Sequence, residues 1–322
     1  MMELLQTLKD RGYPVEYLLS RIRGRRVSLI LDWQPLIHDS APLEHLSSVR
    51  YRGFGVSKSP EVIWRRLLQE YRWVYGQMNG TLRGIFEPFF LYTELRTLVI
   101  ALRHTKNRKA EGVDELLAVS LLSDEVKSVL KAAKDVPETL AGIERFFLSL
   151  SEEFGGLTEI LDTEGLRGVE QRLTNRYLIH IVKSKLHPLM KVFFVRIIDA
   201  RNILNLYKAA RLVAQVAPEY IPGGSITRER FNDMVEKGDL SQVSALTREL
   251  TGIKLDSPDA ARIESALYTG ITRELRKKGK DPLSIGLILD YLWRCSIEAM
   301  NLIMLFYGKD LEREEIEGEL VH

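Results

Sequence analysis

Residues 282–322 read PLSIGLILDYLWRCSIEAMNLIMLFYGKDLEREEIEGELVH. Their apolar residues recur every three or four positions, which is the period of one face of an amphipathic helix. Cys295, Ala299, Leu302 and Phe306 fall on one such face. We therefore expect one long helix, then a turn, then a short acidic helix.

Two of the polar residues in this stretch have a notable spacing. Glu298 and Asn301 are three positions apart, so they project from neighbouring turns of the same side of the helix. The helical neighbours of Glu298, Cys295 and Leu302, are apolar, and we expect the carboxylate to be at least partly buried. A buried carboxylate must be hydrogen-bonded or paired with a cation.

The same spacing of an acid and a polar residue occurs twice earlier in the chain. Asp199 and Asn202 form one pair, and Glu94 and Thr97 form the other; each pair follows two consecutive phenylalanines. The three acids lie roughly a hundred residues apart, as expected of an internally repeated architecture. The repeat predicts three helical domains, at residues 1–112, 113–216 and 217–322.

Composition supports a globular, helical protein. The chain has 322 residues, of which 45% are hydrophobic and 28% charged, and its formal net charge is +2. Apolar–polar alternation of period two is nearly absent, so we expect an all-α fold. No charge-free run approaches the ~20 residues of a membrane span. The expectation is a soluble protein that reaches a membrane only through a partner.

A recurring order of elements accompanies the repeated acids. Each domain is expected to end in a long helix, a break near a proline and a second helix that carries the acid. The expected helix pairs are 61–83 with 86–104, 166–186 with 188–213, and 258–277 with the helix after residue 282, with breaks at Pro88, Pro188 and Pro282. So short a break predicts that each pair folds back antiparallel.

The sequence contains no motif for a cofactor, a metal ion or a known catalytic centre. The six histidines are scattered, and no metal-binding spacing occurs. The glycine pair in Pro222-Gly223-Gly224 lacks the rest of a phosphate-binding loop and is interpreted as a turn. Ser225 or Thr227 can cap the helix that follows. The basic residues Arg21, Arg23, Arg25 and Arg26 are interpreted as a solvated face or as ion-pair donors, and not as a nucleic-acid site.

The repeated acids admit two interpretations. Brought together in one cavity, Glu94, Asp199 and Glu298 could act as general acids or bases; that requires them to converge within about 10 Å. Their repetition favours a structural role, in which each acid binds backbone N–H groups at a neighbouring helix start or turn. Thr97, Asn202 and Asn301 would complete these polar clusters.

At these residues the chain resembles the central-stalk adaptor of rotary V/A-type ATPases, which is the C subunit of archaeal and bacterial complexes and the d subunit of eukaryotic ones. The closing signature of the family is matched by Tyr291, Glu298, Asn301, Leu302, Gly308, Lys309, Glu314, Glu315 and Ile316. Residues 199–203 match its Asp-x-x-Asn-Ile motif, residues 222–226 its Pro-Gly-Gly turn, and Tyr17 with residues 21–23 its opening segment. Thr97 departs from the family, which has asparagine there, and Met300 stands where arginine is frequent.

The resemblance implies three pseudo-threefold-related helical bundles arranged as a funnel. It implies a non-catalytic subunit at the cytoplasmic face of the membrane, without cofactor or metal. The funnel would receive the rotor shaft, seat on the proteolipid ring and transmit torque for proton or sodium transport. Two alternatives stay open: a helical-repeat scaffold outside any rotary machine, and an enzyme that uses the three acids.

Overall fold

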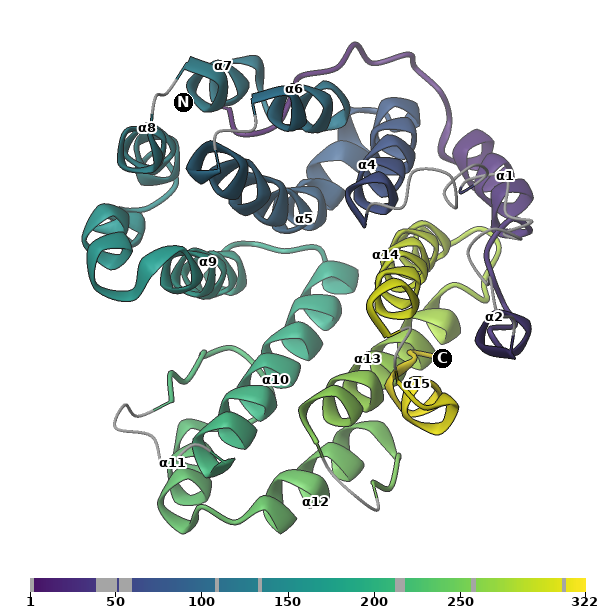
Figure 1. Cartoon of the computed structure of the whole chain (residues 1–322). Helices are drawn as coiled ribbons and strands as arrows, with labels where there is room; N and C mark the ends of the chain where they lie inside the picture. Colours follow the sequence, from purple (N-terminus) through teal and green to yellow (C-terminus); the bar gives the residue numbers. More distant parts are fainter. Residues whose placement is uncertain are drawn as a thin grey trace. The chain divides into compact units, whose positions relative to one another are not determined.

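The computed structural model describes residues 3–38, 51, 60–107, 110–132, 135–211, 218–255, 259–308 and 311–322. These residues form α-helices joined by short connections (Figure 1). They contain no β-strand, and an isolated bridge joins Leu5 to Leu122. The predicted all-α class is confirmed, while the threefold funnel stays a prediction.

Two compact units make up the chain. Unit 1 comprises Met1–Tyr13 and Leu68–Met190, and unit 2 comprises Pro14–Leu67 and Lys191–His322. The N-terminal segment is thus divided between them, because residues up to Tyr13 belong with unit 1 and the following residues with unit 2. The predicted division into three domains stays a prediction.

Unit 1 is built around helix α5. Its helices are the second part of α4 (Pro60–Gln77), α5 (Gly80–Lys106), α6 (Ala110–Val119), α7 (Asp124–Ala132), α8 (Val136–Leu148) and α9 (Leu157–Lys183). Helix α5 packs against α6, α8 and α9. Its Phe89 and Phe90 are buried and meet the ring of Tyr71 edge to face. These aromatic contacts fix α5 as the core helix of the unit.

The predicted break at Pro88 is wrong. Pro88 lies inside α5, and the chain turns earlier, at Asn79, whose side chain accepts a hydrogen bond from the backbone N–H of Leu82. A proline inside a helix removes one backbone hydrogen bond. Here Phe86 and Phe89, on either side of the proline, are buried, and their packing holds the helix together across it.

Helix α9 begins before its predicted start at residue 166. It runs from Leu157, but Gly165 interrupts it with a φ of 69° and a ψ of −171°. These angles are non-helical and suit glycine, which carries no Cβ. The predicted start therefore coincides with the second, regular part of the helix.

Unit 2 contains the two other acid-bearing helices, α10 and α14. Its helices are α1 (Val15–Arg26), α2 (Gln34–His38), the first part of α4, α10 (Pro188–Arg211), α11 (Arg228–Lys237), α12 (Leu240–Thr251), α13 (Ala260–Lys278), α14 (Gly286–Tyr307) and α15 (Arg313–Glu319). The breaks predicted near Pro188 and Pro282 are confirmed. The predicted start of α13 at residue 258 lies outside the described residues.

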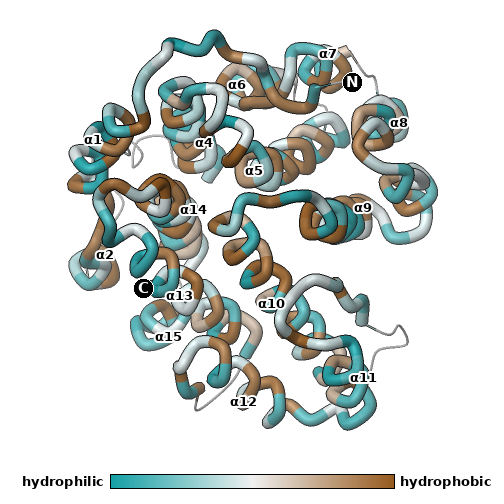
Figure 2. Tube along the Cα trace, turned by 180° about the vertical axis from the view of Figure 1, so that it is seen from behind, coloured by the Kyte–Doolittle hydropathy of each residue, from teal (hydrophilic) through white to brown (hydrophobic). Residues whose placement is uncertain are grey.

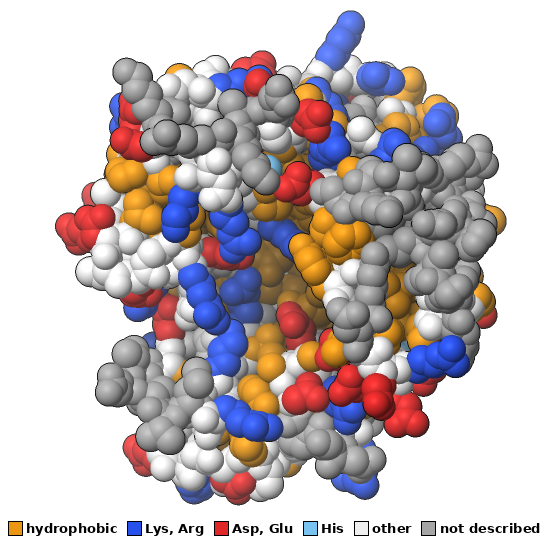
Figure 3. All heavy atoms as spheres, in the orientation of Figure 1, with side chains coloured by type: hydrophobic (Ala, Val, Ile, Leu, Met, Phe, Trp, Pro, Cys, Tyr) orange, Lys and Arg blue, Asp and Glu red, His pale blue; other side chains and the backbone are white. Residues whose placement is uncertain are grey.

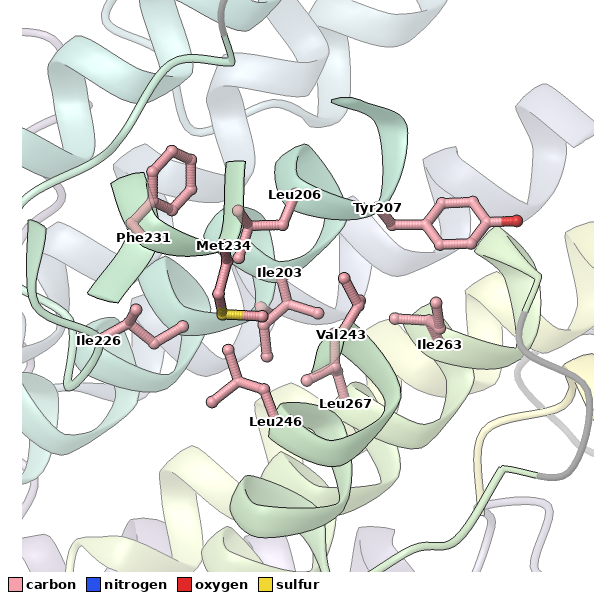
Figure 4. Close-up of a cluster of buried hydrophobic side chains, with 11 residues drawn as sticks. Ile203, Leu206, Tyr207, Ile226, Phe231, Met234, Val243, Leu246, Ile263 and Leu267 are labelled. Atoms are coloured by element: carbon pink, nitrogen blue, oxygen red, sulfur yellow. The ribbon is translucent and has the colours of Figure 1, made fainter. Parts of the chain in front are cut away.

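The core of unit 2 includes a cluster of side chains from four helices and the buried helix α14. Side chains from α10, α11, α12 and α13 form one hydrophobic cluster, which includes Ile203, Phe231, Leu246 and Leu267 (Figure 4). Helix α14 is hydrophobic over most of its length (Figure 2), and it packs against α1, α13 and α15. A helix that is apolar on most sides is typical of a buried position.

The Pro222–Gly224 segment forms the predicted turn before α11. Gly223 has a φ of 96°, a left-handed conformation that favours glycine. Of the two candidate caps, Thr227 holds the N-cap position and accepts from the backbone N–H of Arg230. The hydroxyl of Ser225 binds an acid instead.

Charged side chains of both signs are interspersed over the face shown in Figure 3. Among the described helices none combines the length and apolarity that crossing a membrane requires.

Candidate functional site

Glu94, in the middle of α5, is buried and accepts two hydrogen bonds. The backbone N–H of Leu121 donates to one carboxylate oxygen at 2.6 Å, and the hydroxyl of Ser120 donates to the other at 2.8 Å. Both donors lie in the connection that leads into α7. Glu94 therefore ties the start of α7 to the core helix of unit 1.

Asp199, on α10, binds the connection that leads into α11. The backbone N–H and the hydroxyl of Ser225 donate to its two oxygens at 2.6 and 2.7 Å. The backbone N–H of Ile226 donates at 3.3 Å. Because only 1% of Asp199 is exposed, these bonds replace water as the partners of the carboxylate.

Glu94 and Asp199 bind the same types of donor at the same sequence intervals. In each, a serine hydroxyl comes from 26 residues downstream of the acid. In each, a backbone N–H comes from 27 residues downstream. In each, the donors directly precede a helix. The two acids therefore bind their donors at the same sequence intervals, while the threefold repeat stays a prediction.

Glu298, on α14, binds a segment that precedes it in sequence. The backbone N–H of Ile30 donates to the carboxylate at 2.8 Å, and Ile30 lies in the connection that leads from α1 to α2. Once more the acid binds a backbone amide shortly before a helix. In this case the N-terminal part of the chain supplies the donor.

The two predicted asparagines hold extended backbone by paired hydrogen bonds. Asn202 donates to the carbonyl of Ile221 and accepts from its N–H, at 2.8 and 2.9 Å. Asn301 does the same with Val321, at 2.9 and 3.0 Å. The partners lie 19 and 20 residues after the asparagines. Each amide thus satisfies both polar groups of one buried residue.

Thr97 makes no equivalent contact. Its hydroxyl is buried beside Glu94 but does not meet the geometry of a hydrogen bond with any described residue. The residues at the equivalent distance downstream are Leu116 and Leu117, which lie in α6. A helix satisfies its own backbone N–H and C=O groups, so nothing at this place requires an asparagine.

Gly224 allows the close approach of the turn to Asp199. A Cβ at this position would lie 2.4 Å from a carboxylate oxygen of Asp199 and 2.9 Å from a methyl group of Ile198. Both separations are too short for any side chain, so the second acid contact depends on glycine here.

Burial governs the acidity of these groups. It raises the pKa of Glu94, and the Leu121 N–H, the Ser120 hydroxyl and the nearby Thr97 hydroxyl partly oppose the rise. Burial likewise raises the pKa of Asp199 against the Ser225 and Ile226 hydrogen bonds. Hydrogen bonds to the ionised form favour it, whereas loss of solvent disfavours it.

The chemistry of the three acids is that of fixed acceptors. They bind three different segments, at residues 120–121, 225–226 and 30. A carboxylate occupied by backbone amides serves as an anchor for the chain. In the part of the chain that the structure describes, no three His, Cys, Asp or Glu side chains lie close enough together to hold a metal ion.

Sequence reasoning did not identify the donors Ser120 and Ile30, and it assigned Ser225 only as a candidate cap. One available signal was the equal interval from Glu94 to Ser120 and from Asp199 to Ser225. Ile30 could not be identified from the sequence, because it donates through its backbone N–H, which every residue type except proline has.

Comparison with known proteins gives two concordant results. The family described as ATP synthase (C/AC39) subunit matches residues 43–319. Two relatives, from two strains of Thermus thermophilus, are each named as the C subunit of a V-type ATP synthase. Each is 27% identical over 330 residues, which cover 95% of this chain and 98% of the relative.

Proposed function

The chain belongs to the ATP synthase (C/AC39) subunit family, and we propose that it is the C subunit of a V-type ATP synthase, a central-stalk part without an active site of its own. It seats the rotor shaft on the proteolipid ring at the cytoplasmic face of the membrane, and it transmits torque for proton or sodium transport. The observation that carries the proposal is the match to both relatives over nearly the full length of each chain.

The polar clusters support a mechanical role. A part that transmits torque must resist deformation, and packed helices tied by buried hydrogen bonds are stiff. Glu94, Asp199 and Glu298 each tie a segment that precedes a helix to the middle of a core helix. We assign these acids, with Asn202 and Asn301, the task of holding successive elements in fixed relative positions.

The test is coupling in a reconstituted complex. V-type ATP synthase is assembled in lipid vesicles with and without this chain, and ATP hydrolysis and ATP-driven ion uptake are measured on the same samples. We expect hydrolysis in both, and ion uptake only in vesicles that contain the chain. Equal uptake per ATP without the chain would overturn the proposal.

The free-standing scaffold is the competing function, and co-purification separates it from the proposed one. A tagged chain expressed in its own cells is expected to bring down the proteins of the shaft and the ring. Recovery of other proteins, with neither shaft nor ring, would favour the scaffold.

A further inference from the structure

Unit 2 contains a partly enclosed cavity of about 160 Å³. It is bounded by the segment that follows α1, by α13 and α14, and by the last residues of the chain. Glu298 lies in its wall, so the cavity is adjacent to the third acid contact. The proposed function assigns no role to it.

Charged groups of both signs line the cavity. Arg276 and Arg294 both line it, against the carboxylate of Glu298, which accepts from the Ile30 N–H. Among the described residues neither guanidinium forms a hydrogen bond or an ion pair. Arg276 is exposed and Arg294 is half-buried. A guanidinium carries five N–H donors, so both side chains have donors available for a bound acceptor.

Asp290, which attracts Arg294, is paired with a different arginine. Asp290 is fully buried and forms an ion pair with Arg26 at 2.7 Å. Its second oxygen has no hydrogen-bond partner among the described residues. Burial lowers the pKa of Arg294, against the attraction of Asp290. Asp290 is thus paired with Arg26, and Glu298 accepts from the Ile30 N–H. Neither carboxylate forms an ion pair with Arg276 or Arg294 among the described residues.

The wall also carries apolar side chains, among them Leu29, Trp33 and Ile297. An apolar cavity of about 150 Å³ holds a benzene molecule in another protein. This cavity therefore has room for a group of the size of a benzene ring or a branched alkyl chain. An apolar wall with two arginines suits a ligand with one charged and one apolar end.

We propose that this cavity binds a carboxylate carried on a small apolar group, with the carboxylate on Arg276 and Arg294 and the apolar group against Leu29, Trp33 and Ile297. Arginine pairs with carboxylates in a planar, two-point geometry. Inorganic phosphate shares the charge but cannot use the apolar wall. The ligand is either a free carboxylic acid or the terminal carboxylate of a polypeptide, since both present the same chemistry.

Calorimetric titration of the full chain tests the proposal with matched pairs of probes. Benzoate and its neutral counterpart benzamide represent a free acid. N-acetyl-leucine and N-acetyl-leucinamide represent a polypeptide terminus with and without its charge. We expect at least one carboxylate to bind with a dissociation constant of about 1 mM or lower. Its amide, and phosphate, should bind at least about tenfold more weakly.

Variants then locate the binding. Arg276 is exposed and makes no described hydrogen bond, so Arg276→Gln leaves the fold intact and should weaken carboxylate binding at least about tenfold. Arg273→Gln is the matched control, because Arg273 is exposed on the same helix and does not line the cavity. It should bind as the unchanged chain does. Arg294→Gln should also weaken binding, and its melting temperature checks that it folds.

The outcomes decide the proposal and the source of the ligand. Tighter binding of N-acetyl-leucine supports the site with a polypeptide terminus as its ligand, and tighter binding of benzoate supports it with a free acid. The proposal is overturned if neither carboxylate shows binding at a ligand concentration of about 10 mM, which is ten times the expected dissociation constant. Equal binding of the amides, or unchanged binding to the Arg276→Gln variant, also overturns it. The coupling experiment is independent of these results.

Discussion

A single carboxylate such as Glu94 is unfavourable in a protein interior unless donors replace the water it has lost. The Leu121 N–H and the Ser120 hydroxyl supply that replacement. They are themselves buried, so the acid and its donors need one another. Removing the acid alone leaves both buried donors without a partner. An unpartnered buried donor destabilises the protein by more than a typical hydrogen bond stabilises it.

Glu94→Ala should therefore lower the free energy of unfolding by about 1–3 kcal/mol, through stranded donors. Denaturation in urea, followed by circular dichroism, measures the change. Glu94→Gln is the control, because its amide oxygen still accepts from Leu121 and the Ser120 hydroxyl can turn to accept from its NH₂ group. A Gln variant as unstable as the Ala variant would show that charge, and not hydrogen bonding, is what matters here.

The raised pKa of Glu94 predicts a pH dependence. The native carboxyl holds its proton more tightly than the unfolded one, so its contribution to stability is fully present below the ordinary glutamate pKa of 4.5 and is lost as the pH rises through the native pKa. The free energy of unfolding of the unchanged chain should fall relative to that of Glu94→Gln as the pH rises above 4.5. A difference that stays constant, or that grows in the opposite sense, would contradict the assigned burial.

At the scale of secondary-structure elements, the acids and asparagines hold connections to helices. Asn202 and Asn301 each bind both polar groups of one residue in an extended segment. The residues 19 and 20 positions after Thr97 lie in α6, and a helix satisfies its own backbone. Position 97 is a threonine, whereas positions 202 and 301 are asparagines. We attribute this difference to α6, which lies at the sequence interval where the two asparagines bind an extended segment.

This contrast predicts unequal effects of removing the side-chain polar groups. Asn202→Ala should lower the free energy of unfolding by about 1–3 kcal/mol, because the N–H and C=O of Ile221 lose their partner. Thr97→Val, which keeps the shape and removes the hydroxyl, should change it by less than about 0.5 kcal/mol or raise it. Chemical denaturation of both variants gives the comparison. A loss at Thr97 as large as that at Asn202 would mean that the threonine hydroxyl is bonded after all.

Gly224 sets the distance between the turn and α10. Gly224→Ala forces a methyl group against Asp199 and Ile198, and it should lower the free energy of unfolding by about 1–3 kcal/mol. Gly24→Ala is the matched control, since Gly24 lies inside α1 with nothing within 4 Å of the added Cβ. It should raise stability by about 0.5–1 kcal/mol, as alanine does in a helix. Thermal unfolding of both variants tests this prediction. If Gly224→Ala leaves the stability unchanged, the turn can shift to accommodate the added methyl group.

At the scale of the whole molecule, the helical class and the acid-bearing helices were predictable because apolar periodicity records burial directly. The repeated acids were predictable for the same reason, since a charge on an apolar face stands out. Pro88 misled the prediction, because aromatic packing around it outweighs the lost hydrogen bond. The partner of Glu298 was unpredictable, because a backbone N–H 268 residues away carries no residue type.

The most direct measurement is an electron-microscopy reconstruction of the V-type ATP synthase purified from cells that express this chain. The proposed function predicts one copy of the chain on the central axis, between the tip of the shaft and the proteolipid ring. A complete, coupled complex with no density for the chain on that axis would contradict it.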